Sequence, residues 1–290
     1  MSTLDLRPLS IGELLDRTFS LYRRNFLLFI GITAIPHLFV LAVKLSQVAF
    51  MPVANRVNTM PLSPGASPGS VSGNFAAYGA LALLSIFVSL AAILFSQGGT
   101  VFAVSELYLG KETTIGQSFS RAKGEVWTLL GVLILHSLVM IVSFLLLIFP
   151  ALYMACRLCV AVPAALLENL GPREALERSF ALTKDNAGRS FLIYLLYFAI
   201  LYAAVALFAI PFGIGIVFSQ NDPTMLRTWT ALSEVGSFLA QVLITPVLTI
   251  GMSIFYFDLR VRKEAFDIQM MMNPLAGSVP APRAAASILS

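Results

Sequence analysis

Charged residues are scarce in this sequence. Asp, Glu, Lys and Arg make up 12% of the 290 residues, about half of their usual share in soluble domains, whereas hydrophobic residues make up 58%. This balance excludes a large soluble catalytic domain. Cysteine is scarce as well, and two cysteines exclude a disulfide-rich secreted scaffold. A basic stripe with interleaved aromatic residues is lacking, so the net charge of +4 indicates loops that face anionic lipid and not nucleic acid.

The hydrophobic residues are gathered in six long runs, each long enough for a helix to cross a bilayer core of about 30 Å. Pro150 separates the third run from the fourth. The predicted spans are residues 26–50, 75–104, 127–149, 150–167, 191–218 and 235–257. We therefore predict an all-α polytopic membrane protein with six transmembrane helices.

Two segments outside the spans are predicted to be irregular. Residues 51–74 are rich in Pro, Gly and Ser, which is typical of a flexible loop. Residues 273–290 contain three prolines and a run of alanines, and we predict a disordered C-terminal tail. Residues 1–272 then form a single membrane domain. Its first apolar run exceeds the roughly 7–15 residues of a signal-peptide core, so we predict an uncleaved first span.

Lys and Arg residues are distributed unevenly between the two sides of these spans. Fifteen of the 19 lie in the N-terminal segment, in the loops after the second and fourth spans, or after the last span. The four others are Lys44, Arg56, Arg157 and Arg227. Because positive charge is retained on the cytoplasmic side of a membrane, the distribution predicts that both termini are cytoplasmic.

A repeated segment precedes the first, third and fifth spans. The first and third copies lie 161 positions apart and share six identical residues, from Glu13 with Glu174 to Asn25 with Asn186. Each copy begins with a helix-start signal: Ser10 and Thr114 head capping boxes, and Gly171 heads a looser one. In the first copy, apolar residues at steps of three and four form one face of an amphipathic helix. These residues are Ile11, Leu15, Phe19, Tyr22 and Phe26.

The three copies predict three amphipathic helices on the cytoplasmic membrane surface, in a pseudo-threefold repeat of helix plus hairpin. One interpretation is a collar that senses lipid or docks a partner; the other is that the helices only anchor and orient the odd-numbered spans. Six basic residues are predicted to contact lipid headgroups at this interface. They are Arg17, Arg23, Arg24, Arg178, Lys184 and Arg189.

Three stretches of the sequence resemble a known family. Residues 7–17 read RPLSIGELLDR, residues 175–180 read ALERSF, and residues 256–267 read YFDLRVRKEAFD. They are similar to the bacterial glycerophosphoryl diester phosphodiesterase membrane-domain family, and the resemblance covers about residues 6–268. It implies a multi-helical module of the bacterial cytoplasmic (inner) membrane. A catalytic barrel of the kind fused to some members needs roughly 250 residues, so no phosphodiesterase domain is expected after the last span.

Arg157 is the sharpest single candidate for a binding residue. It lies inside the fourth apolar run, roughly 10 Å along the helix from Pro150. An arginine at the centre of a span costs about 2.5–3.5 kcal/mol, so it needs a partner or a route to the interface. Two interpretations stay open: a site for an anionic ligand or lipid headgroup, and a structural contact.

Other chemistry has little support. His37, His136 and the pair Cys156 and Cys159 could suggest zinc, but nothing in the sequence brings the histidines near the thiols, so we predict no metal and no cofactor. No nucleophile motif or pair of intramembrane aspartates is present. Glycines 98, 99, 213 and 215 lack the context of a phosphate-binding loop and are predicted to allow close helix packing or kinks.

These observations predict a non-enzymatic integral membrane protein, a scaffold or accessory subunit that engages lipid headgroups, a partner protein, or both. The alternative is a small-solute or lipid transporter with a cavity near Arg157, where spans interrupted by proline expose backbone groups. A continuous polar lining of the bundle would favour the transporter. A dry, filled interior with an apolar groove on the cytoplasmic face would favour the scaffold.

Overall fold

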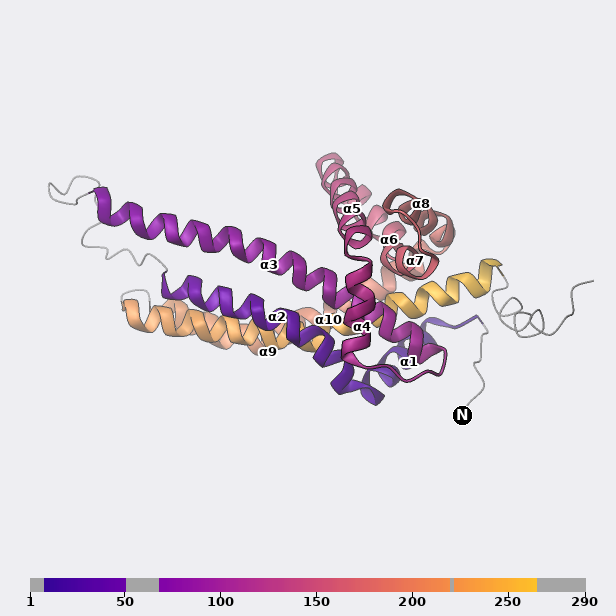
Figure 1. The fold of residues 1–290 in the computed structure, drawn as a ribbon, viewed down its shortest axis with the longest axis horizontal. Coiled ribbons are helices and arrows are strands. Elements are labelled where there is room, and N and C mark those ends of the chain that lie inside the picture. Colours follow the sequence, from indigo (N-terminus) through magenta and orange to yellow (C-terminus); the bar gives the residue numbers. More distant parts are fainter. Residues whose placement is uncertain (1–7, 51–67, 220–221, 265–290) are drawn as a thin grey trace, which may run out of the picture.

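The structure, a computed structural model, describes residues 8–50, 68–219 and 222–264. These residues form ten α-helices and no β-strand, which confirms the all-α prediction (Figure 1). The helices are α1 (Ile11–Arg24), α2 (Phe26–Ala49), α3 (Pro68–Tyr108), α4 (Ile115–Gly124), α5 (Val126–Leu146), α6 (Ile148–Leu158), α7 (Ala161–Glu168), α8 (Pro172–Thr183), α9 (Ala187–Phe218) and α10 (Pro223–Glu264).

Six segments are long and apolar enough to cross a membrane, in agreement with the predicted number. They are Phe26–Ala49, Ala77–Tyr108, Val126–Leu146, Ile148–Glu168, Ala187–Phe208 and Thr224–Glu264. Many of their large apolar side chains face outward; the exposed fraction reaches 82% at Phe149 and 85% at Phe218. Such exposure of apolar surface is expected where lipid is the solvent.

The three helices that precede α2, α5 and α9 begin at the predicted caps. Ser10 and Glu13 form a reciprocal capping box, in which the amide of Ser10 donates to Glu13 Oε2 at 2.7 Å. Thr114 and Gln117 form a second one. The amide of Gly171 donates to a carboxylate of α8, with Pro172 at the first helical position. The cap signals therefore placed the starts of α1, α4 and α8 correctly.

The predicted path of the third and fourth spans needs two corrections. The chain breaks at Leu147 and not at Pro150, which lies within the first turn of α6. Proline lacks an amide hydrogen and its ring collides with the carbonyl four residues earlier, here that of Leu146, so its effect is felt upstream. The fourth segment is also divided, because helical structure is interrupted at Cys159 and Val160 between α6 and α7.

The predicted loop over residues 51–74 is wrong in its last part, since α3 already begins at Pro68. Proline is well accepted at the first position of a helix, where its missing amide would have no partner anyway. Residues 51–67 and the predicted tail over 273–290 lie outside the described residues. The last helix also exceeds its predicted span at both ends.

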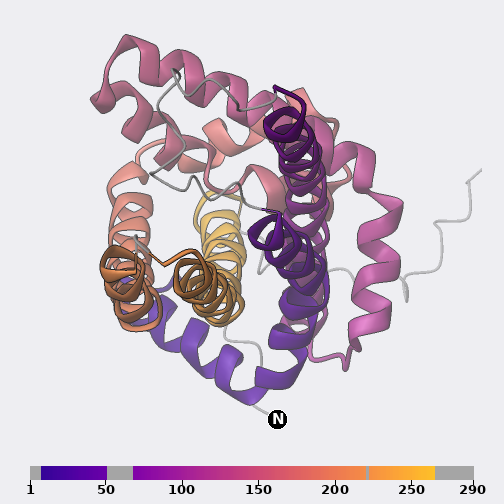
Figure 2. The same ribbon diagram turned by 90° about the vertical axis from the view of Figure 1, so that its left-hand side faces the viewer.

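Four long helices, α2, α3, α9 and α10, run lengthwise beside one another (Figure 1). The hairpin of α5 and α6 crosses their direction, as the view along the bundle shows (Figure 2). Helices α1, α4, α7 and α8 gather at the end where α10 terminates. We call this the hub end, because α10 there contacts α1, α3, α7, α8 and α9.

The core of the hub end is the last part of α10. Every residue from 250 to 259 is buried, and Phe255 and Tyr256 are fully so. Helix α1 packs on this segment through Leu14 and Thr18, which are 0% and 2% exposed. The predicted apolar face of α1 is therefore rotated from the packed face, and Phe19 is exposed. Thr18 stands opposite Gly251 of α10, where a Cβ would lie 3.7 Å from the Thr18 hydroxyl, an ordinary contact distance.

Glycines also set the approach of other helix pairs, as predicted for three of the four named from the sequence. A Cβ at Gly99 would lie 2.9 Å from Ile32 of α2, and one at Gly98 would lie 2.8 Å from Leu129 of α5. A Cβ at Gly215 would collide with the ring of Trp229. Gly213 has open space around it and does not serve this purpose.

Candidate functional site

A buried carboxylate, Asp258 of α10, organises one side of the hub end. Its side chain is fully buried. One oxygen accepts the amide hydrogen of Leu9 at 2.7 Å, and the other accepts from Arg189 at 2.7 Å and from Arg262 at 3.0 Å. Both arginines also donate to the carbonyl of Leu9. The two backbone groups of a single residue before α1 are thus held by charged side chains of α9 and α10.

A second charged cluster lies on the neighbouring face of α10 and joins it to α7 and α8. The carboxylate of Glu168 accepts two hydrogen bonds from Arg178, at 2.8 and 3.1 Å, and one from the hydroxyl of Tyr256 at 2.7 Å. Arg178 also forms an ion pair with Glu264, which in turn accepts from Arg260. Because positive and negative side chains alternate at close range in this cluster, it holds α7, α8 and α10 together.

The charge state of Arg178 follows from its surroundings. Burial alone would lower the pKa of its guanidinium, but hydrogen bonds and the negative charges of Glu168 and Glu264 outweigh burial and raise the pKa above its ordinary value. The guanidinium therefore stays protonated. Neither carboxylate is left as a free acid or base, because each is held by arginines.

Arg157 lies at the end of α6, half-buried. Its guanidinium stands over the ring of Phe180 of α8, 4.9 Å from the centroid, and over Tyr153 at 5.8 Å. Its backbone carbonyl accepts hydrogen bonds from the hydroxyls of Ser179 and Thr183. Within the described residues its Nε atom is buried and has no hydrogen-bond partner. Arg157 thus contributes to the packing of α6 on α8 and keeps unused hydrogen-bonding capacity.

The six residues predicted to contact lipid fall into two groups. Arg178 and Arg189 belong to the two charged clusters, and Arg17 donates to the hydroxyl of Tyr108 of α3. Arg23, Arg24 and Lys184 are exposed and, among the described residues, form no ion pair. All six residues lie at the hub end, because each belongs to α1, α8 or α9 or directly follows α8.

The exposed face of α1 has the residue types of a lipid contact. Asp16, Phe19, Ser20, Arg23 and Arg24 line a shallow depression of about 420 Å³ on it. Beyond the depression, Phe26 and Leu27 at the start of α2 are 41% and 81% exposed. Two exposed arginines are therefore followed in the chain by apolar side chains of which one is partly and the other largely exposed.

The inner side of α1 is held more firmly. The hydroxyl of Tyr22 donates to the carbonyl of Leu243 of α10 at 2.9 Å, and burial raises the pKa of Tyr22 to about 12. The ring of Tyr22 also lies edge-on to Phe26. Helix α1 is therefore fixed to the bundle on one side and open on the other.

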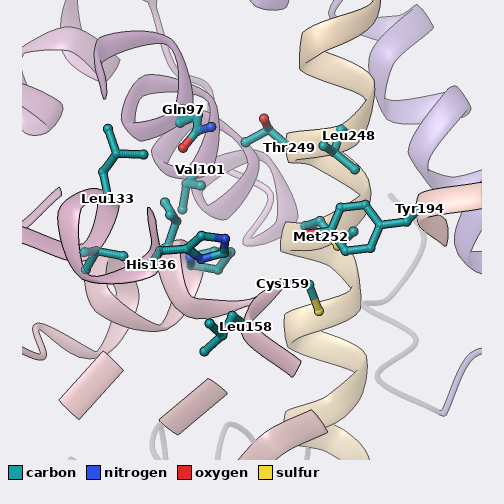
Figure 3. A pocket seen from close by; sticks show the side chains of 13 residues that line it. Gln97, Val101, Leu133, His136, Leu158, Cys159, Tyr194, Leu248, Thr249 and Met252 are labelled. Carbon is teal, nitrogen blue, oxygen red and sulfur yellow. The ribbon is translucent and has the colours of Figure 1, made fainter. Parts of the chain in front are cut away.

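An interior cavity of about 170 Å³ lies between α3, α5, α7, α9 and α10 (Figure 3). Polar side chains of three helices reach it: Gln97 of α3, His136 of α5 and Tyr194 of α9. Thr249 of α10 and Cys159, at the break between α6 and α7, also line it. Arg157 does not, although the two residues that follow it do.

Sequence reasoning missed one ion pair inside the bundle. Lys44 of α2 and Glu234 of α10 are 2.9 Å apart, with His37 and Gln241 lining the same narrow space. The Nδ1 atom of His37 lies 2.8 Å from the carbonyl of Thr33, to which it must donate. A signal was available, since a lone lysine inside the first apolar run calls for a partner and Glu234 directly precedes the sixth run.

Metal ligands do not converge in the part of the chain that the structure describes. No group of three His, Cys, Asp or Glu side chains there could hold a metal ion. Cys156 and Cys159 are free thiols, and the thiol of Cys159 donates to the hydroxyl of Ser190.

The apolar spans, the outward-facing side chains and the charged hub end define a polytopic helical membrane protein. Residues 129–267 match the family model described as the membrane domain of glycerophosphoryl diester phosphodiesterase, so this segment is similar to that family. The resemblance inferred from the sequence is thereby confirmed from α5 onward, and the match includes Glu168, Arg178, Arg189 and Asp258. Curated proteins and solved structures gave no match to the chain.

Proposed function

We propose that this protein is a non-enzymatic membrane scaffold or accessory subunit that engages the headgroups of anionic lipids through the outer face of α1. The observation that carries this proposal is the pair Arg23 and Arg24, exposed beside Phe26 and Leu27. A helix placed at a membrane surface buries its apolar side chains near the acyl boundary and directs its arginines to phosphates. Trp127, 82% exposed at the start of α5, suits the same boundary.

The absence of enzymatic activity is part of the proposal. General acid–base or nucleophilic catalysis needs groups that are free to exchange protons or to attack a substrate. The best-placed carboxylates of the hub end, Glu168 and Asp258, are instead occupied by arginines. Their arrangement supports a rigid platform on which a lipid-binding surface, or a surface for a partner protein, is held.

Lipid binding is tested with the double variant Arg23→Gln/Arg24→Gln in nanodiscs. A basic residue near an anionic surface contributes about 1 kcal/mol, so the double variant should bind phosphatidylglycerol about 30-fold more weakly than the native protein. Native mass spectrometry over a series of phosphatidylglycerol fractions measures this. Arg173→Gln, which removes an exposed arginine paired with Glu177, is the control and should change binding less than twofold. Equal retention of anionic lipid by the double variant would contradict the proposal.

We further propose that the hub end faces the cytoplasm of a bacterium, with the protein in the cytoplasmic membrane. The uneven distribution of Lys and Arg supports this orientation. In a Cys156→Ala/Cys159→Ala background, Ser63→Cys should react with a membrane-impermeant maleimide added to intact cells, and Lys111→Cys should react only after lysis. The reverse pattern would invert the orientation.

A second candidate function is the transport of a small solute or lipid. One observation favours it: the interior cavity begins at Leu158 and Cys159, directly after Arg157, and polar groups reach it. Arg157→Gln should then reduce solute flux into proteoliposomes at unchanged protein density. If the variant carries every solute at the same rate as the native protein, Arg157 takes no part in transport.

A further inference from the structure

The interior cavity has unsatisfied hydrogen-bonding groups that converge from separate helices. Within the described residues, the side chains of Gln97, His136 and Tyr194 line the cavity and make no hydrogen bond to protein. Gln97 and His136 lie on the side of α3 and α5, and Tyr194 lies on the side of α9 and α10 (Figure 3). All three side chains are half-buried and line the same partly open cavity, so one occupant with a polar group could hydrogen-bond to more than one of them.

The lining also limits the charge of an occupant. None of the 13 residues around the cavity is an Asp, Glu, Lys or Arg. The nearest arginine along the chain, Arg157, holds its guanidinium against Phe180 and Tyr153. A charged molecule would lose its hydration without meeting an opposite charge, which excludes it on energetic grounds.

The volume and the polarity of the cavity further restrict the kind of molecule that it can bind. At about 170 Å³ the cavity slightly exceeds an engineered protein cavity of about 150 Å³ that holds benzene. It is too small for the acyl chains of a phospholipid. Leu133, Leu158, Leu248 and Met252 offer apolar surface opposite the polar groups. A purely apolar molecule would fit by volume but would leave Gln97 and His136 unpaired.

We propose that this cavity is a binding site for a neutral small molecule of roughly six to ten non-hydrogen atoms that carries a hydroxyl or amide group on an apolar body. The amide of Gln97 and the imidazole of His136 each offer a donor and an acceptor to that group, and the leucines and Met252 contact the apolar body. The site is independent of the lipid-binding face of α1, and equilibrium binding to it does not require transport.

Three matched probes test the class: benzyl alcohol, toluene and benzoate. Saturation-transfer NMR titrations use the full-length protein in phosphatidylcholine nanodiscs, with empty nanodiscs to subtract partition into lipid. Benzyl alcohol should bind saturably and at least about tenfold more tightly than toluene, because its hydroxyl can form two hydrogen bonds that toluene cannot form. Benzoate should not bind. Absence of saturable binding of the alcohol, or equal binding of alcohol and toluene, would overturn the proposal.

Two kinds of variant locate the probe. The double variant Gln97→Leu/His136→Leu keeps the shape of the cavity. It should lower the affinity for benzyl alcohol at least about tenfold and change the affinity for toluene by less than about twofold. Leu133→Phe fills the cavity from a half-buried position and should abolish saturable binding of both. Ser137→Ala changes the exposed neighbour of His136 and is the control. Gel filtration and tryptophan fluorescence establish that each variant is folded. Alcohol binding that survives both changes would place the site elsewhere and contradict the assignment.

Discussion

The variant Asp258→Asn is expected to lower the free energy of unfolding by about 3–5 kcal/mol, the usual cost of breaking a buried ion pair from one side. The native carboxylate is fully buried and neutralises Arg189 and Arg262, which are 2.7 and 3.0 Å away. An asparagine retains one oxygen for the amide of Leu9 but leaves both guanidinium groups uncompensated. Denaturant titration in mixed micelles, followed by the fluorescence of Trp127 and Trp229, measures the change.

Two further measurements separate this effect from a general loss of structure. Amide hydrogen exchange of Leu9 should accelerate more than that of Leu14, because only Leu9 is held by Asp258. The variant Arg189→Gln should show a coupling of about 1.5–3 kcal/mol with Asp258→Asn in a double-mutant cycle. A loss of stability below about 1 kcal/mol, or additive effects of the two changes, would mean that the clamp on Leu9 contributes little.

The number of apolar segments could be predicted because hydropathy acts over many residues and each residue adds to the same signal. The starts of α1, α4 and α8 could be predicted because a capping box is local: both partners lie within four residues of the chain. The packed face of α1, in contrast, could not be predicted from the sequence. Thr18 lies on it with its hydroxyl satisfied by the carbonyl of Leu14, so a polar residue occupies a position that an apolar count assigns to solvent.

The charged clusters depend on packing between distant helices, which no local pattern specifies. Asp258 holds Leu9 across 249 positions, and Lys44 meets Glu234 across 190. Part of the arrangement could nevertheless be predicted from the spacing of residues in the sequence. Tyr256, Arg260 and Glu264 recur at intervals of four and so share one face of a helix, while Asp258 and Arg262 share another. The family-like stretch at residues 256–267 thus carries two rows of contacts, and its partners are supplied by α7, α8 and α9.

The breaks in the helical path were misplaced because proline acts at a distance. Pro150 ends α5 four residues upstream through its collision with a carbonyl, whereas Pro36, Pro211 and Pro246 lie within continuous helices. The same residue type therefore has different outcomes. Exposure of the neighbouring side chains does not separate these cases, because Phe39 near Pro36 and Leu207 near Pro211 are as exposed as the end of α5.

The variant Glu168→Gln is expected to lower the free energy of unfolding by about 2–3 kcal/mol, through loss of charge-assisted hydrogen bonds from Arg178 and Tyr256. The loss should be smaller than for Asp258→Asn, because the Glu168 side chain is 18% exposed and Arg178 retains its pair with Glu264. The same denaturant titration measures it.

The control on this prediction is an exposed ion pair on α8, the helix that carries Arg178. Arg173 and Glu177 are 2.9 Å apart but 86% and 64% exposed, so Glu177→Gln should cost less than about 0.5 kcal/mol. Tyr256→Phe removes only the hydroxyl contact to Glu168 and should show a coupling of about 1 kcal/mol with Glu168→Gln. Equal losses for Glu168→Gln and Glu177→Gln would show that the cluster is no stronger than a surface pair. The brace between α7, α8 and α10 would then rest on apolar packing, through residues such as Ala164, Leu182 and Phe257.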